Sequence, residues 1–234
     1  MKLSDFKQET TDFIISSRAK LFCGAKKSFR GWVSSIRSSG KITFITLRDS
    51  GGYIQLVAEA ATMGEKLYAI ARSLNRETVI IATGEVKEGY RSEDFEILLS
   101  DIRIVSESKD FPIGDKEHGS EFLFDNRHLY LRDEKVRAIM KIRSAIFQYS
   151  REFLFQEGFY EFSSPIITPT SCEGTTTLFE LDYFGESAYL SQSGQLYSEA
   201  GIFSLEKIFC FGPLFRAEKS KTRRHLTEFW AVEP

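Results

Sequence analysis

The stretch SFRGWVSSIRSSGKITFITLRDSGGYIQLVAE, residues 28–59, holds three segments of strand character separated by the turn signals SSG and DSGG. In the middle segment, Ile45 and Leu47 share one side of the chain, whereas Phe44 and Thr46 share the other. Side chains of a strand alternate between the two faces of a sheet. We therefore predict consecutive strands with one face packed into a core and the other face available to a ligand.

The segment at residues 52–59 shows the same alternation. Ile54 and Leu56 face one way, and Gln55 and Val57 face the other. Further along, a helical period appears in residues 61–75, followed by strand patterns at residues 78–86 and 95–105. Three strands, a helix and two strands within roughly eighty residues is the layout of an OB-fold, a five-stranded barrel that binds oligonucleotides. Other small barrels fit the pattern equally well.

The second half of the chain has a different pattern. Residues 106–126 are polar and contain Pro and Gly, which predicts a linker. A long amphipathic helix is expected from Asp133 to about Glu157, with acidic residues at its positive N-terminal end and Gly158 at its C-cap. Its predicted apolar face consists of Val136, Ile139, Ile142, Ile146, Phe153 and Leu154. Short strand-like runs follow, which predict an α+β domain with a largely antiparallel sheet.

Composition excludes several classes of protein. The chain has 234 residues and 31 Lys and Arg against 33 Asp and Glu, and no apolar run approaches the roughly 18 residues of a membrane span. Its three cysteines are far apart and form no CxxC pair, which argues against a disulfide scaffold or zinc ribbon and suits a reducing compartment such as the cytoplasm. Residues 1–105 are slightly basic and residues 106–234 acidic, as two modules with different partners or simple surface scatter would give.

The segment FGPLFRAEKSKTRRHLTEFWAVEP, residues 211–234, carries the densest chemical signal. Two apolar strands flank a basic polar loop, and they place Arg216 near an aromatic residue, Phe229. Arginine grips phosphate oxygens with two parallel hydrogen bonds, and an aromatic ring can stack on a purine. The basic loop alone would also fit a solvated surface hairpin, but the flanking FRAE and RHLTEF favour a nucleotide site.

These same residues, FRAE and RHLTEF, resemble motif 2 of the class II aminoacyl-tRNA synthetases, in the version shared by aspartyl and asparaginyl enzymes. FQEGFYEFSSPIITP, residues 155–169, is similar to motif 1, which builds the homodimer interface in that family. The resemblance implies three parts: an anticodon-binding OB-fold in residues 1–105, a hinge in residues 106–126, and the N-terminal part of a catalytic domain in residues 127–234.

The resemblance assigns ATP as a substrate and gives roles to the hairpin. Arg216 would bridge the α-phosphate and the amino-acid carboxylate as the catalytic residue, and Glu218 would hold the adenine and ribose region. Phe229 would stack on adenine. The loop that meets the γ-phosphate would contain Arg224, His225 and Leu226. Mg²⁺ is expected as a cofactor, with its ligands beyond Pro234.

The amino-acid pocket is implied by two other segments. Glu173, in SCEGTTT, matches a mobile loop that receives the substrate ammonium group, although such a residue also fits a solvated loop. In QSGQLYSE, residues 192–199, Ser193 and Gln195 match pocket residues, and Ser198 stands where aspartyl enzymes carry a lysine. A pocket without that cation would leave a substrate carboxylate unpaired, which is costly. The site is therefore predicted to take asparagine.

The barrel strands also match the family. Phe44 takes the position of the aromatic that stacks on the central anticodon base, and Gln55 that of the residue that hydrogen-bonds its edge. Arg37 takes that of an arginine on the anticodon loop. Stacking combined with edge hydrogen bonds is how single-stranded loop bases are recognised. Phe44 could instead be a core residue of the second face.

One family element is missing from the sequence. No GxGxxR of motif 3 occurs among the 16 glycines. The chain is therefore expected to bind tRNA(Asn) weakly and to form no adenylate by itself. An aspartate–tRNA ligase, including a non-discriminating form, remains an alternative, as does a non-catalytic nucleic-acid-binding module.

Overall fold

The computed structural model describes residues 13–89, 95–114, 116–170, 178–219, 222 and 225–234. The chain divides into two compact units, Met1–Phe122 and Leu123–Pro234. We call them the barrel unit and the C-terminal unit and describe each by itself. The residues predicted as a linker, 106–126, contain a short helix, α4 (Ser120–Asp125), and the two units divide within it.

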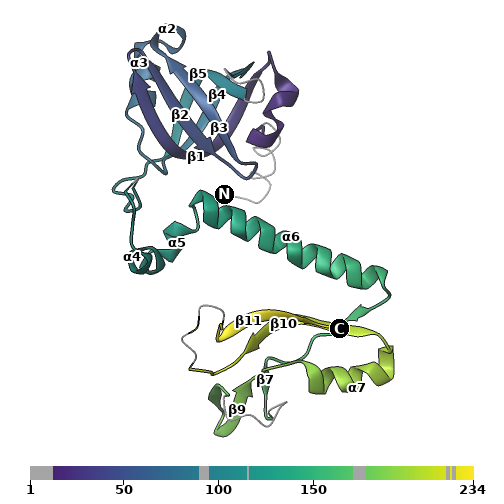
Figure 1. Cartoon of the computed structure of the whole chain (residues 1–234). Coiled ribbons are helices and arrows are strands. Elements are labelled where there is room, and N and C mark those ends of the chain that lie inside the picture. The colour runs from purple at the N-terminus through teal and green to yellow at the C-terminus, as the bar shows by residue number, and fades with distance from the viewer. Residues whose placement is uncertain (1–12, 90–94, 115, 171–177, 220–221, 223–224) are drawn as a thin grey trace. The chain divides into compact units, whose positions relative to one another are not determined.

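Five strands of the barrel unit close on themselves in the order β1-β2-β3-β5-β4 (Figure 1). Their bounds are Lys26–Ser39 (β1), Ile42–Arg48 (β2), Tyr53–Glu59 (β3), Val79–Glu88 (β4) and Phe95–Ser106 (β5). Only the β3–β5 pair is parallel among these five. This strand order and content confirm the predicted OB-fold.

Short helices complete the barrel. A 3-10 helix, η1 (Ser16–Phe22), precedes β1, and α2 (Ala60–Met63) and α3 (Glu65–Arg72) lie at one end of the barrel (Figure 1). The single helix predicted for residues 61–75 is therefore two helices. Gly64 separates them with a φ of 79°, a left-handed conformation that favours glycine.

The alternation predicted for β2 and β3 is confirmed. Ile45, Leu47 and Leu56 are fully buried in the barrel core. Val57, expected on the ligand side, is nevertheless only 5% exposed. It lies between Phe44 of β2 and Leu98 of β5 in the sheet register, and these neighbours cover a side chain that has no polar tip.

A buried ion pair ties β2 to the turn before β4. The two terminal guanidinium nitrogens of Arg48 donate to the carboxylate of Glu77, at 2.6 and 2.8 Å. Both side chains are less than a tenth exposed. Glu77 has a positive φ of 66°, so this turn holds a conformation that a side chain rarely adopts. A buried pair of this kind is strongly destabilising to break.

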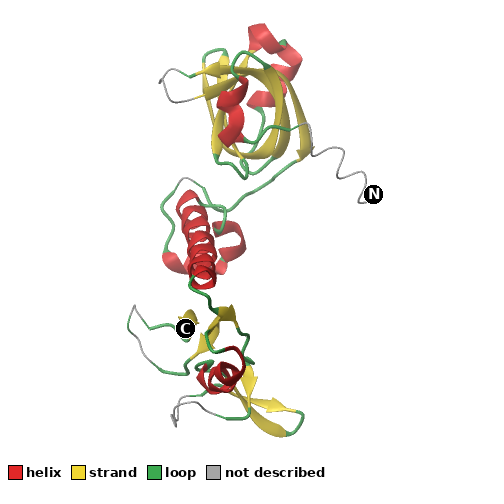
Figure 2. Cartoon of the chain, turned by 90° about the vertical axis from the view of Figure 1, so that its right-hand side faces the viewer, coloured by secondary structure: helices red, strands yellow, loops and turns green. Residues whose placement is uncertain are grey.

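The C-terminal unit contains two small sheets, with strand orders β11-β10-β6 and β7-β9-β8. Figure 2 shows its strands in separate short groups, in contrast to the continuous wall of the barrel. The elements are α5 (Arg127–Tyr130), α6 (Glu134–Gln156), β6 (Tyr160–Glu161), β7 (Ile167–Thr168), β8 (Glu180–Tyr183), β9 (Glu186–Leu190), α7 (Gln195–Leu205), β10 (Ile208–Phe215) and β11 (Glu228–Glu233). All of these strand pairs are antiparallel except β6–β10, which confirms the predicted α+β character.

The ends of α6 follow from its sequence. The carboxylate of Asp133 accepts hydrogen bonds from the backbone N–H of Lys135 and Val136, as an N-cap does. At the other end Glu157 is the C-cap, one residue before the predicted Gly158, which follows with a φ of 84°. The N–H of Phe159 then bonds back into the last turn of the helix, as in a Schellman motif.

Most of the predicted apolar face of α6 is exposed. Only Leu154 of that face is buried, whereas Ile142 and Phe153 are about 60% exposed. The helix packs on the β10–β11 hairpin along the stripe that holds Leu154, beside the exposed part of the predicted face, and there Phe147 contacts Phe211 and Trp230 with ring centroids 4.8 and 5.0 Å apart. Among the described residues, no helix is both long and apolar enough to cross a membrane.

Candidate functional site

The β10–β11 hairpin has two chemically distinct faces. Its register pairs Leu214 with Phe229 and Cys210 with Glu233. Because strand side chains alternate, Phe211 and Trp230 lie on the side that packs against α6. The opposite side, which we call the site face, carries the residues Cys210, Gly212, Leu214, Phe229, Ala231 and Glu233.

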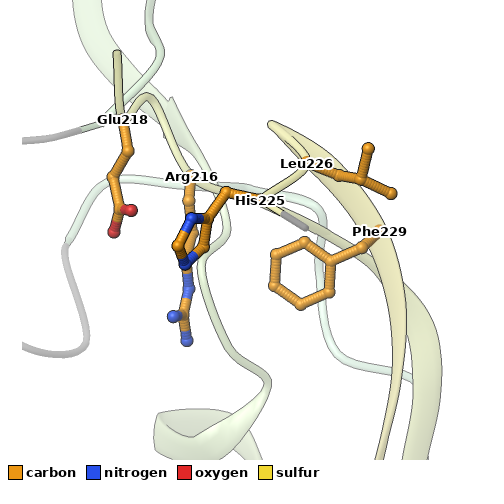
Figure 3. Close-up of a pocket in the computed structure, with 5 residues that line it drawn as sticks. All are labelled: Arg216, Glu218, His225, Leu226 and Phe229. Carbon is orange, nitrogen blue, oxygen red and sulfur yellow. The ribbon is translucent and has the colours of Figure 1, made fainter. Parts of the chain in front are cut away.

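At the end of the hairpin where a loop joins β10 to β11, the site face leads into a pocket of about 290 Å³. Figure 3 shows the five side chains that line it, four from the segment between the two strands and one from β11: Arg216, Glu218, His225, Leu226 and Phe229. The guanidinium carbon of Arg216 lies 5.5 Å from the centroid of the Phe229 ring. Five of the residues that the sequence predicts for ATP therefore converge, whereas Arg224 lies outside the described residues.

Local hydrogen bonds explain this arrangement. The backbone N–H of Arg216 donates to the carbonyl of Thr227 at 2.9 Å, so the hairpin ladder continues one step past β10. Nδ1 of His225 shares a hydrogen bond with the hydroxyl of Thr222 in the loop. A cation, a carboxylate and an aromatic face then border one cavity, which is a combination suited to a nucleotide.

The loop between β9 and α7 is fixed to the other end of the site face. The hydroxyl of Ser193 donates to one carboxylate oxygen of Glu233 at 2.7 Å, and the N–H of Gly194 donates to the other at 3.0 Å. The N–H of Phe215 also donates to the carbonyl of Ser191. Glu233 was not predicted from the sequence; its only signal was the alternation in EFWAVE, which places it on the same side as Phe229.

The predicted amino-acid residues do not all meet. The hydroxyl of Ser198 lies 3.0 Å from the thiol sulfur of Cys210, so Ser198 joins the polar end of the site face. Gln195 is exposed, and its amide donates to Glu199 along the surface of α7. A side chain at Gly194 would lie 2.9 Å from the Cys210 sulfur, so this glycine lets α7 approach β10. Glu173 lies outside the described residues.

A cavity of about 200 Å³ adjoins this polar end. Its lining residues come from β10, from Glu233, from Ser191 after β9 and from the segment after β6. They combine apolar side chains such as Phe162 and Leu214 with the hydroxyls of Ser163, Ser164 and Ser191. Among the described lining residues, Glu233 is the one charged side chain, so serine hydroxyls and one negative charge border an otherwise largely apolar cavity.

A second site lies on the barrel. The guanidinium carbon of Arg37 is 4.7 Å from the centroid of the Phe44 ring, and Arg37 donates to the amide oxygen of Gln55 at 3.2 Å. The amide nitrogen of Gln55 donates to Glu96 at 3.1 Å. All three residues predicted for the anticodon thus meet on the outside of the barrel. Glu96 was not predicted from the sequence, because it meets Gln55 only through the pairing of β5 with β3.

The described residues offer no evident metal centre. No group of three or more His, Cys, Asp or Glu side chains able to hold a metal ion is found among them. The Mg²⁺ expected from the sequence therefore has no ligand set in the part of the chain that the structure describes.

Comparison with known families agrees with the two sites. Residues 119–234 match the family described as tRNA synthetases class II (D, K and N), and residues 27–105 match the family described as OB-fold nucleic acid binding domain. The chain therefore belongs to the class II tRNA synthetases, as its motifs predict. Members of this class use ATP and Mg²⁺.

Its relatives are more specific. The asparagine–tRNA ligase of Pelotomaculum thermopropionicum is 48% identical over 91% of this chain and 50% of its own length, and that of Sorangium cellulosum is 47% identical over 94% and 50%. The asparaginyl-tRNA synthetase of Pyrococcus horikoshii, solved with asparaginyl-adenylate, has a TM-score of 0.84 at 40% identity, over 91% of this chain and 50% of that one. A putative aspartyl-tRNA synthetase from Leishmania major reaches 0.80 at 26% identity, over 96% and 47%. The chain spans about half the length of the curated relatives it matches.

Proposed function

We propose that this chain is part of an asparagine–tRNA ligase. Such an enzyme activates asparagine with ATP to asparaginyl-adenylate and then transfers the asparagine to tRNA(Asn), releasing AMP. The observation that carries the proposal is the site face, with Arg216 and Phe229 at one end and, at the other, a cavity in which Glu233 is the one charged side chain among the described lining residues. The small pair Gly212 and Ala231 lies between these ends in the hairpin register. An aminoacyl-adenylate needs such a bipartite site.

Arg216 is the proposed catalytic residue. In the activation step a carboxylate oxygen of asparagine attacks the α-phosphorus of ATP, and pyrophosphate leaves. A guanidinium that contacts both the carboxylate and the α-phosphate would orient them and stabilise the charge of the transition state. Glu218, His225, Leu226 and Phe229 would hold the nucleotide, and Arg224 and Glu173 keep their proposed roles at the γ-phosphate and the substrate ammonium group. Mg²⁺, when bound, would neutralise charge on the phosphates.

The charge of the amino-acid cavity supports asparagine over aspartate. A substrate carboxylate would meet the carboxylate of Glu233 without the lysine that aspartyl enzymes carry, because Ser198 occupies that position. Two like charges at close range are unfavourable, whereas an amide can donate to Glu233 and bond to serine hydroxyls. Ser193, Ser198 and Gln195 are the proposed pocket residues, and Gln195 would have to leave Glu199 to reach the substrate.

The barrel is the proposed anticodon-binding part. Arg37 and Gln55 are hydrogen-bonded to each other beside the ring of Phe44, on the outside of a closed barrel. A base stacked on Phe44 would therefore find an amide and a guanidinium at its edge.

The proposal also includes the location and assembly of the enzyme. It would act in the cytoplasm as a homodimer formed through residues 155–169, and the exposed apolar side of α6 would contribute to the dimer interface.

Substrate choice is tested by calorimetric titration with two non-hydrolysable adenylate analogues, asparaginyl- and aspartyl-sulfamoyl adenosine. The chain should bind the asparaginyl analogue at least tenfold more tightly, and Ser198→Lys should narrow or reverse this ratio. Ser198→Ala is the matched control, because it removes the hydroxyl without adding charge. Equal binding of both analogues by the unaltered chain would contradict the assignment to asparagine.

A further inference from the structure

The outside of the barrel carries an aromatic residue that the anticodon triad does not include. Trp32 is 43% exposed, whereas Phe29 and Val33 of the same strand are fully buried and Ile36 is partly buried. An exposed tryptophan on a strand of a nucleic-acid-binding fold needs an explanation beyond packing, since the same ring would gain more free energy by burial. Its position relative to Phe44 suggests one.

The strand register arranges the outer side chains of β1, β2 and β3 in three rows. The first row holds Arg37, Phe44 and Val57, and the second holds Ser35, Thr46 and Gln55. The third row holds Trp32, Arg48 and Tyr53. A β-bulge at residue 34 keeps Trp32 on the outer side, in register with Arg48. We call these three rows the ladder face.

The first and third rows contain the same kind of contact, an arginine beside an aromatic ring. In each row an aromatic and an arginine face each other across β1 and β2, with the guanidinium carbon 4.7 Å from the ring centroid for Phe44 and 5.6 Å for Trp32. Arg48 is itself held by Glu77, so it supports one side of the Trp32 ring from a fixed position. The exposed remainder of that ring is directed to solvent.

The spacing of the two rings suits a run of unpaired nucleotides. Trp32 is paired with Arg48 in the sheet, and Arg48 is four residues from Phe44 on β2. The two aromatic residues therefore lie about 13 Å apart along the strand direction, at the usual rise of a strand. An OB-fold can hold about 4–16 nucleotides, so a strand face of this length accommodates more than one base. Two exposed arginines of β1, Arg30 and Arg37, flank Trp32 and can neutralise phosphates.

We propose that Trp32 is a second stacking platform, which takes an unpaired base of the anticodon loop next to the bases held at Phe44 and Gln55. The inference rests on the proposed binding of the anticodon loop by the barrel. The second row, with its hydroxyls and amide, then lies between two stacked bases.

The test uses fluorescence of the whole chain in a Trp230→Phe background, where Trp32 is the only tryptophan. Titration with the anticodon stem-loop RNA of tRNA(Asn) should quench Trp32, because a stacked base quenches indole emission. Trp32→Leu should weaken stem-loop binding about 5- to 100-fold, since one stacked base contributes that much, and should leave the salt dependence of binding unchanged. Trp32→Phe should lose less than Trp32→Leu.

Val105→Ala is the matched control, since Val105 is an exposed apolar residue of the same barrel outside the three rows. Thermal melts verify that each variant is folded. Stem-loop binding without quenching, with Trp32→Leu binding as tightly as the control, would overturn the platform and leave the anticodon role of Phe44 intact. If the unaltered chain binds no stem-loop, the anticodon role and this inference both fall.

Discussion

The barrel unit and the C-terminal unit bury their apolar residues to very different extents. In the barrel unit, Phe29, Ile45 and Leu56 belong to one continuous core and are fully buried. In the C-terminal unit, large apolar side chains of both α6 and α7 face solvent, with Ile142 60% and Phe203 95% exposed. The barrel therefore offers its ligand face on a core complete in itself, whereas the hairpin site depends on packing against one side of α6.

Both units nevertheless use the same element of recognition. Each candidate site places an arginine against an aromatic ring on a neighbouring strand, Arg37 with Phe44 and Arg216 with Phe229. Both arginines are exposed, but on the barrel the pair is held further by a hydrogen bond from Arg37 to Gln55. We infer that the barrel site is the more nearly preformed of the two.

The largest expected effect is on the free energy of unfolding of the barrel. Glu77→Gln removes the charge that pairs with Arg48 and should lower the free energy of unfolding of the barrel by about 3–5 kcal/mol. Urea unfolding followed through Trp32, in the Trp230→Phe background, measures it. The double variant Arg48→Met/Glu77→Leu leaves no unpaired charge and should lose much less. If Glu77→Gln lowers the free energy of unfolding by less than about 1 kcal/mol, water hydrates the guanidinium of Arg48 in place of the carboxylate and the account of a buried ion pair is wrong.

A core truncation comes next. Leu56→Ala leaves a cavity in a closed barrel and should cost about 2–5 kcal/mol in the same urea experiment. Unfolding of the C-terminal unit, followed through Trp230 in a Trp32→Phe background, should be unchanged. If both transitions move together, the two units unfold cooperatively and the contrast between them is wrong.

A smaller effect tests the fit of α7 against the hairpin. A methyl group at position 194 would lie 2.9 Å from both Cys210 Sγ and Ser164 Oγ, so Gly194→Ala should cost the C-terminal unit about 1–3 kcal/mol. Cys210→Ala in the same chain should relieve part of that loss. Gly212→Ala is the matched control, because a methyl group there has no neighbour within 4 Å, and its unfolding midpoint should not change. If Gly194→Ala leaves the unfolding free energy of the C-terminal unit unchanged, α7 is free to move away from β10.

The smallest effect on stability is expected at the exposed side of α6. Ile142→Ser should change the unfolding free energy of the chain by no more than about 0.5 kcal/mol, because the side chain is mostly in water already. If this side forms the proposed homodimer, sedimentation velocity should show weaker self-association. A large loss of stability without a change in self-association would place Ile142 in an intramolecular contact instead.

The sequence predicted those parts of the fold that depend on local pattern. Alternation placed Ile45 and Leu56 in the core and Phe44 outside it, and the hairpin pattern together with the motif 2 resemblance predicted that Arg216 and Phe229 share a pocket. The fold could be assigned because each strand of the barrel and of the hairpin is consistent with a period of two.

The parts that could not be predicted depend on contacts between distant segments. Glu96 meets Gln55 only because β5 pairs in parallel with β3, and Glu233 meets Ser193 only because α7 begins against the hairpin. The side of α6 that packs could not be chosen either, because two sides of that helix are apolar and only one contacts the sheet.

The central claim is that two separate sites on two units bind two different substrates, and a crossed titration tests it most directly. Phe44→Ala and Arg216→Ala are each titrated with the anticodon stem-loop and with asparaginyl-sulfamoyl adenosine. Phe44→Ala should lose about 5- to 100-fold in stem-loop affinity and bind the adenylate analogue normally. Arg216→Ala should lose about 10- to 100-fold for the analogue and bind the stem-loop normally. The claim is contradicted if either variant loses both ligands or neither.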